Sequence, residues 1–166
     1  MSESLTSPIS LLVRQLADKL LAKKLIISTA ESCTGGWISQ SLTALAGSSV
    51  WFDSGFVTYS NEAKQRLLNV PPALFSIDGP GAVSEAVVLA MTAGAIHGSR
   101  ANLAVAVSGI AGPDGGTEEK PVGTVWIAWQ WEDKSLARCF YFSGDRESVR
   151  HAAVLAALEG CLLLVD

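Results

Sequence analysis

The sequence has few histidines, few cysteines and no long apolar run, and each shortage excludes a class of protein. Its 166 residues include two histidines and three cysteines. Because the cysteines have no metal-ligand spacing, we expect no zinc centre and no other bound metal. Their odd number cannot be fully paired within the chain, and the N-terminal segment has no pattern of a secretory signal. These features predict a reducing, cytoplasmic location.

Positive charge is also scarce. Twelve lysines and arginines oppose 16 acidic residues, which gives a formal net charge of -4. Proteins that bind duplex nucleic acid usually have the opposite sign, because phosphate neutralisation supplies their affinity. The most apolar tail, residues 154–165, is interrupted by Glu159 and is shorter than the roughly 20 apolar residues of a membrane span. We therefore expect neither a nucleic-acid partner nor a membrane partner.

Apolar residues are abundant and predict an ordered fold. Hydrophobic residues make up 49% of the chain and charged residues 17%, which excludes disorder for most of it. The length predicts a single domain over residues 1–166, with a core at about 9–164.

The periodicity of apolar residues predicts alternating helices and strands. Helices are expected over 9–22, 36–46, 62–68, 84–98 and 145–164. Strands are expected over 25–29, 50–59, 103–107, 122–131 and 136–142, with a bulge or turn at 53–55. This alternation predicts an α/β fold with three layers, α/β/α, around a mixed β-sheet, because the last two strands resemble an antiparallel hairpin. Ligands of such sheets bind in loops beyond the strand ends.

Two glycine-rich segments follow predicted buried strands. Residues 29–36 (TAESCTGG) lie where a strand leads into a helix, so they could bind an anion or oxyanion, or form an ordinary capped turn. Residues 107–116 contain four glycines, which free the backbone to approach a ligand. The alternative is a long surface connection. Neither segment has the spacing of a dinucleotide fingerprint or a P-loop, and we expect no cofactor.

Two further segments contain candidate cationic residues. Lys64 could act as a general base if its pKa fell from about 10.4 to about 7–8; otherwise it is a solvated helix lysine. Arg146, in SGDR at 143–146, could bind a phosphate or carboxylate, or lie in solvent behind an Asp145 helix cap. His97 and His151 lie beside no hydroxyl-rich loop, so nothing favours a Ser-His-Asp triad.

Taken together, five segments resemble one family. They are TAESCTGG at 29–36, GSSVWFDSGFVTYSNEAK at 47–64, GAVSE at 81–85, VSGIAGPDGGTEEKPVGTVW at 107–126 and SGDR at 143–146. In this order they resemble the CinA C-terminal domain family over roughly residues 9–164, most closely its stand-alone form. Larger CinA proteins carry an additional N-terminal domain for which this chain has no room, so we expect none of that domain's activities.

The resemblance implies hydrolysis of the amide of nicotinamide mononucleotide (NMN) to nicotinate mononucleotide and ammonia, within pyridine nucleotide recycling. It also implies catalysis by serine and lysine with a tyrosine nearby. The catalytic candidates are Ser32, Ser49, Tyr59 and Lys64. Candidate substrate contacts are Thr34, Gly35, Gly36, Ser48, Ser108, Gly109, Gly112 and Arg146.

The attacking serine remains open between Ser32 and the Ser48–Ser49 pair. Cys33 is intrinsically a better nucleophile, but no histidine is evidently placed to activate it, so we interpret it as a structural thiol. Two non-catalytic alternatives are a nucleotide-sensing module and an interaction domain associated with competence or DNA damage. The joint presence of serine, tyrosine and lysine candidates argues against a purely binding role.

We also expect a homodimer. The aromatic strands 50–59 and 122–131 and the apolar last helix exceed what a small core needs. The family resemblance implies the same assembly.

Overall fold

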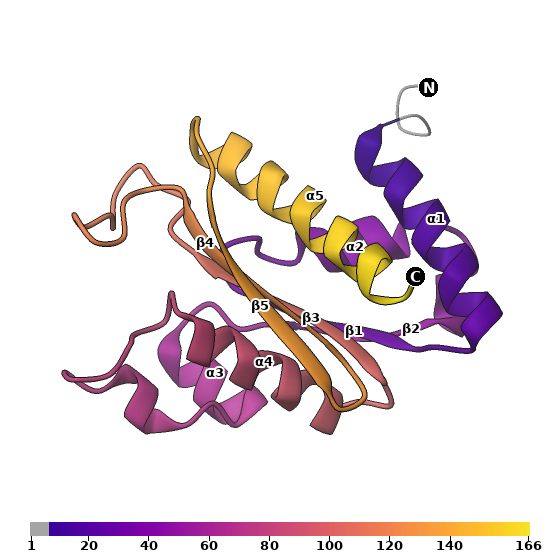
Figure 1. Cartoon of the computed structure of the whole chain (residues 1–166), viewed down its shortest axis with the longest axis horizontal. Coiled ribbons are helices and arrows are strands. Elements are labelled where there is room, and N and C mark those ends of the chain that lie inside the picture. Colours follow the sequence, from indigo (N-terminus) through magenta and orange to yellow (C-terminus); the bar gives the residue numbers. More distant parts are fainter. Residues whose placement is uncertain (1–6) are drawn as a thin grey trace.

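A five-stranded mixed sheet forms the middle layer of the computed structural model, which describes residues 7–166 (Figure 1). Its strands are β1 (Ile27–Glu31), β2 (Phe52–Val57), β3 (Leu103–Gly109), β4 (Thr124–Trp131) and β5 (Lys134–Tyr141), in the order β2-β1-β3-β4-β5. β1 runs parallel to β2 and β3, whereas β4 is antiparallel to β3 and β5. The predicted mixed α/β sheet is confirmed. The first six residues of the predicted 1–166 domain lie outside the described residues.

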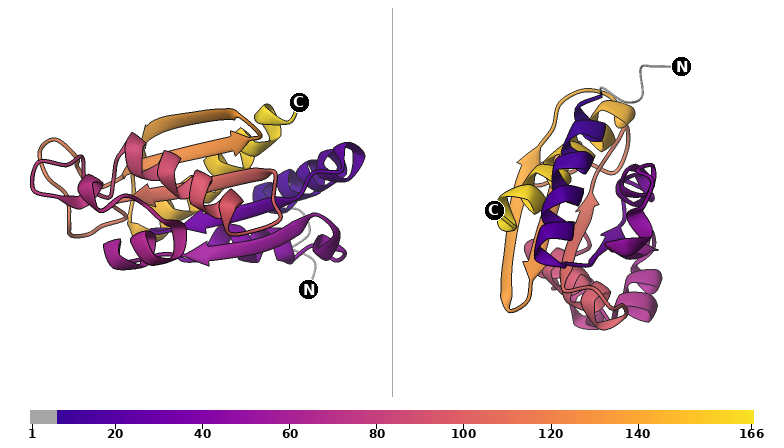
Figure 2. Two further views of the ribbon diagram at one scale, coloured as in Figure 1. Left: turned by 90° about the horizontal axis from the view of Figure 1, so that it is seen from below. Right: turned by 90° about the vertical axis from the view of Figure 1, so that its right-hand side faces the viewer.

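Helices cover both faces of the sheet, as Figures 1 and 2 show. One face packs against α1 (Pro8–Lys23), α2 (Trp37–Thr43) and α5 (Arg146–Leu164), and the other against α3 (Asn61–Leu68) and α4 (Glu85–His97). Two short 3-10 turns, Ser48–Val50 and Pro72–Phe75, complete the described elements.

The sheet has a large hydrophobic core on one face and a smaller one on the other, because side chains of different size alternate between the two faces along its strands. On β3 the large residues Leu103, Val105 and Val107 belong to the core under α1 and α5, while Ala104 and Ala106 belong to the core under α4. Successive side chains of a strand point to opposite faces. Small side chains on one face allow α4 to approach the sheet closely.

The helix starts follow side-chain caps. The hydroxyls of Ser60 and Ser84 and the carboxylate of Asp145 accept hydrogen bonds from backbone N–H groups in the first turns of α3, α4 and α5. Such caps satisfy N–H groups that have no partner within the helix. Serine and aspartate are among the residue types preferred at this position, so the local sequence accounts for where these three helices begin.

Several predicted boundaries are wrong. The first strand spans Ile27–Glu31 rather than 25–29, because the strand continues through a buried charged residue that in sequence is typical of a loop. The predicted helix 36–46 ends at Thr43, and the predicted strand 50–59 begins only after a 3-10 turn. The expected four-residue turn between the last strands is confined to Glu132 and Asp133.

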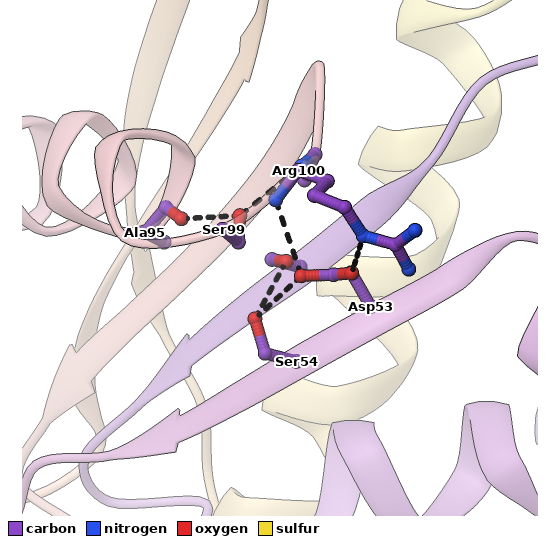
Figure 3. Close-up of polar contacts among 7 residues, drawn as sticks. Asp53, Ser54, Ala95, Ser99 and Arg100 are labelled. Carbon is purple, nitrogen blue, oxygen red and sulfur yellow. Dashed lines mark hydrogen bonds and ion pairs between the residues drawn. The ribbon is translucent and has the colours of Figure 1, made fainter.

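The predicted irregularity at 53–55 is a bulge at Asp53. Ile27 pairs with Phe52 and Ser28 with Ser54, which leaves Asp53 unpaired in the ladder. Its carboxylate accepts from the backbone N–H of Arg100 at 3.2 Å and from Arg100 Nε at 2.8 Å (Figure 3). These hydrogen bonds lower the pKa of Asp53. They tie the edge strand β2 to the turn that precedes β3.

The topology brings several chain segments together at the end of the sheet where the parallel strands β1, β2 and β3 have their C-terminal ends. Because β1, β2 and β3 are parallel, the segments that follow them all leave from the same edge. The start of α5 also lies there, because β5 ends opposite the first residue of β4, next to the end of β3. Separately, no helix within residues 7–166 has both the length and the apolar character to cross a bilayer.

Candidate active site

The centre of the site is a contact between Ser32 and Lys64. Ser32 is the first residue after β1, and its N–H donates to the carbonyl of Val107 on β3 at 3.0 Å. Lys64 lies in the first half of α3, and its Nζ is 2.9 Å from Ser32 Oγ. The end of β1 and the start of α3 therefore bring a hydroxyl and an amine into hydrogen-bond distance.

Lys64 is buried, with a relative exposure of 1%. Burial lowers the pKa of its ammonium, because the charged form loses hydration. Its Nζ donates to the carbonyls of Thr58 at 2.8 Å and Tyr59 at 3.3 Å. Among residues 7–166, no carboxylate forms an ion pair with it. Burial without a carboxylate partner favours the neutral amine.

The three oxygens around Lys64 Nζ can accept from the three N–H groups of an ammonium, and they are equally compatible with a neutral amine. A neutral amine has two N–H groups and one lone pair. Its N–H groups can donate to the carbonyls of Thr58 and Tyr59, and its lone pair can then accept the proton of Ser32 Oγ. The arrangement suits a base that activates a serine hydroxyl.

Cys33 is poorly suited to be the nucleophile. Its side chain is buried, and burial raises the pKa of the thiol to about 12. The thiolate, not the thiol, is the reactive form. The interpretation of Cys33 as a structural thiol agrees with this environment.

A buried carboxylate organises the turn after Ser32. Glu31 is fully buried, and its two oxygens accept five hydrogen bonds, from Thr34 Oγ1, Gly36 N, Ile38 N, Ser39 N and Ser39 Oγ. Both oxygens are therefore occupied, which makes Glu31 unsuited to act as a base. Gly35 and Gly36 have φ angles of 61° and 98°, in the left-handed region that favours glycine.

A cleft of about 270 Å³ opens above Ser32 and Lys64. Arg146, at the start of α5, lines its wall; Nη1 donates to the carbonyl of Gly112 at 2.7 Å and Nη2 to the hydroxyl of Tyr59 at 2.9 Å. Ser108 also lines the cleft, and its hydroxyl donates to the carbonyl of Ala82 at 2.8 Å, so its proton is already engaged within the protein.

The structure brings together most of the residues singled out from the sequence. Those that line the cleft are Ser32, Tyr59, Lys64, Ser108, Gly109, Gly112 and Arg146. Thr34, Gly35 and Gly36 do not line it; the hydroxyl of Thr34 is used by Glu31, and the glycines permit the turn. Their expected substrate contacts stay a prediction, because the cleft geometry gives these residues a structural part in the turn and no place in the lining.

Ser48 and Ser49 are not brought to the cleft. They lie in the 3-10 turn before β2, whereas the cleft lies beyond the C-terminal ends of β1, β2 and β3. The whole of β2 separates them from Lys64. The alternative that this pair supplies the nucleophile, and the expected substrate contact of Ser48, do not fit this geometry.

Among the polar side chains of the cleft, Asn61 and Asp114 were missed from the sequence. Asn61 lies one helical turn before Lys64, so the i, i+3 spacing on α3 could have identified it. Asp114 lies in the glycine-rich loop, and no pattern distinguishes it from a surface acid. His97 and His151 lie outside the cleft, and His151 instead packs edge-on against Trp37.

Known proteins with related sequences and structures share this whole domain. The sequence pattern of the CinA C-terminal domain matches residues 10–165. A protein of Pseudomonas putida named nicotinamide-nucleotide amidohydrolase PncC is 51% identical over 157 residues, which cover 95% of this chain and 97% of that protein. Its namesake in Escherichia coli (strain K12) is 50% identical over 149 residues, 89% of each chain.

A solved structure extends the likeness to the fold. The competence/damage inducible protein CihA from Agrobacterium tumefaciens is 44% identical and superposes with a TM-score of 0.92, over 96% of this chain and 97% of that one. A sequence match from residue 10 to 165 and this structural agreement cover nearly every described element, so the chain belongs to the CinA C-terminal domain family.

Proposed function

We propose that this protein hydrolyses the carboxamide of NMN to nicotinate mononucleotide and ammonia. The observation that carries the proposal is the 2.9 Å contact between Ser32 Oγ and the buried Lys64 Nζ at the base of a cleft. The relatives named nicotinamide-nucleotide amidohydrolase, about 50% identical over most of the chain, support the choice of substrate.

The reaction has two halves that use the same pair of residues. Neutral Lys64 accepts the proton of Ser32 Oγ while the oxygen attacks the amide carbon. Collapse of the tetrahedral intermediate breaks the C–N bond, and the Lys64 ammonium donates its proton so that ammonia leaves. Water then attacks the ester on Ser32 while Lys64 accepts a proton from it. As the bond between the carbonyl carbon and Ser32 Oγ breaks, the Lys64 ammonium returns that proton to Oγ, and the product leaves as a carboxylic acid that ionises in water.

Arg146 and Tyr59 form the anchoring part of the cleft in this proposal. The guanidinium holds Tyr59 and the Gly112 carbonyl with two of its donors, which fixes its direction and leaves other donors for a ligand. A phosphate oxygen suits such a charge-assisted contact. The glycine-rich loop adds backbone N–H groups beside it.

No observation favours the non-catalytic alternatives. A module that only senses a nucleotide has no need of a lysine buried against a serine, since burial of an amine is unfavourable. A cytoplasmic location belongs to the same proposal, because a phosphorylated substrate does not readily cross a membrane.

The first test compares two neighbouring residues. Ser32→Ala should reduce ammonia release from NMN by several orders of magnitude, since it removes the nucleophile. Cys33→Ala is the matched control and should keep most of the activity, because its thiol is buried and protonated. An active Ser32→Ala variant beside an inactive Cys33→Ala variant would reverse the assignment.

The second test concerns Lys64 and pH. With burial lowering the pKa of Lys64, kcat should rise with pH through that lowered pKa and reach a plateau below the ordinary lysine range. Lys64→Arg and Lys64→Met should both lose at least ~10²-fold in kcat, because arginine keeps the charge but cannot deprotonate. Near-normal kcat in Lys64→Arg would make the lysine an electrostatic anchor instead.

The third test concerns Arg146. Arg146→Ala should chiefly raise KM for NMN by about 10–150-fold, the equivalent of about 1.5–3 kcal/mol for a charge-assisted contact. Nicotinamide riboside lacks the phosphate, so it should be a poor substrate that barely responds to the substitution. Equal losses with both substrates would place Arg146 at the reacting end of the cleft.

The fourth test concerns assembly, and a homodimer is part of the proposal. Leu136 and Tyr141 on the edge strand β5 and Leu163 near the end of α5 are exposed apolar or aromatic side chains. Their burial between two copies would stabilise a dimer. Light scattering should give about twice the 17.4 kDa chain mass, and a monomer at micromolar concentration would contradict the proposal.

A further inference from the structure

Arg150 holds the backbone turn that carries Ser32. It lies in α5, one turn after Arg146, and it is not part of the cleft lining. Its Nε donates to the carbonyl of Cys33 at 3.0 Å, and its Nη2 donates to the carbonyl of Thr34 at 3.0 Å. A single guanidinium thus binds two successive carbonyls directly after the nucleophile.

These two bonds fix the orientation of two peptide groups. The C=O and N–H of a trans peptide point in opposite directions. By holding the Cys33 and Thr34 carbonyls toward α5, Arg150 directs the N–H groups of Thr34 and Gly35 away from it. The Gly35 N–H returns to the carbonyl of Ser32 at 3.0 Å, so the constraint reaches the nucleophile's own backbone.

The other side of the same turn is held by Glu31. That carboxylate accepts from the N–H of Gly36, at the end of the turn, and from the N–H of Ile38, in the first turn of α2, whereas Arg150 binds the carbonyls of Cys33 and Thr34. The Arg150 guanidinium also lies 5.4 Å from the centre of the Trp37 ring, which restricts its own position. The Glu31 carboxylate thus binds an N–H group of this turn, and the Arg150 guanidinium binds two of its carbonyls.

We infer that Arg150 is a positioning residue for the Ser32 nucleophile. Within residues 7–166, Lys64 is the one side chain that forms a hydrogen bond with Ser32 Oγ, so the position of this oxygen depends strongly on the backbone that carries it. The inference rests on the proposed serine hydrolysis. The planar guanidinium is required at this position, because a lysine ammonium beside the Trp37 ring could not hold the two carbonyls with two donors at a fixed spacing.

The experiment measures NMN hydrolysis by Arg150→Lys and Arg150→Ala. We expect kcat to fall about 10- to 100-fold in both, the scale of a small misplacement of a reacting group, while KM stays near that of the wild type. The pH midpoint of kcat should not move, because the environment of Lys64 is intact. Added methylguanidinium should restore part of the rate of Arg150→Ala.

Arg14→Met provides the matched control, since Arg14 is an exposed arginine on α1. It should leave kcat and KM unchanged. Near-normal kcat in both Arg150 variants would overturn the inference. A rise in KM at constant kcat, or a fall in rate fully explained by the unfolded fraction measured by circular dichroism, would overturn it as well.

A second readout separates this inference from the proposed function. A fluorophosphonate reagent labels activated serines regardless of the natural substrate, and mass spectrometry locates the adduct. Arg150→Lys should label Ser32 more slowly than the wild type does. If the wild type labels Ser32 but releases no ammonia from NMN, the proposed substrate fails while Arg150 is still tested; equal labelling rates would overturn the positioning role.

Discussion

The burial of Lys64 is the constraint on which the rest of the site depends. A dry interior disfavours an ammonium, so a lysine is tolerated there only where its N–H groups find acceptors and its proton can leave. Thr58 and Tyr59 supply acceptors because β2 ends at Val57, and their carbonyls lie beyond the strand. The remaining direction around the nitrogen is occupied by Ser32. The same features that make burial tolerable therefore direct the lone pair toward the nucleophile.

That geometry requires strand ends from distant parts of the chain to meet. β1 delivers Ser32, β2 leads into α3 and Lys64, and β3 leads into the glycine-rich loop. The chain reverses direction between β3 and β4 and again between β4 and β5, so β5 ends on the same side of the sheet as β3. α5 consequently starts beside the cleft, where Arg146 lines the wall and Arg150 binds the turn after Ser32. The antiparallel part of the sheet thus serves to return the chain to the site.

Much of this arrangement could be predicted from the sequence, and the failures have physical causes. The mixed sheet followed from the periodicity of apolar residues, and the grouping of Ser32, Tyr59 and Lys64 was implied by the family resemblance. The choice between Ser32 and Ser49 did not, because it depends on which strands are parallel neighbours: one serine follows a strand and the other precedes one. Arg150 has the pattern of an ordinary helix arginine, and only its contacts across 117 residues reveal its position.

The site contains two kinds of cationic side chain, lysine and arginine, and their environments differ because one must lose its charge and the other must keep it. A base must lose its charge near neutral pH, which a buried amine can do and a guanidinium cannot. An anchor for a phosphate and a clamp on carbonyls must keep their charge, which a guanidinium does in any environment. Lys64 accordingly lies in the interior, whereas Arg146 is exposed and Arg150 half-buried. An arginine at position 64 would place a permanent charge in the protein interior. A lysine at position 146 or 150 would replace the planar guanidinium with a single flexible ammonium, which cannot hold two acceptors in a fixed geometry.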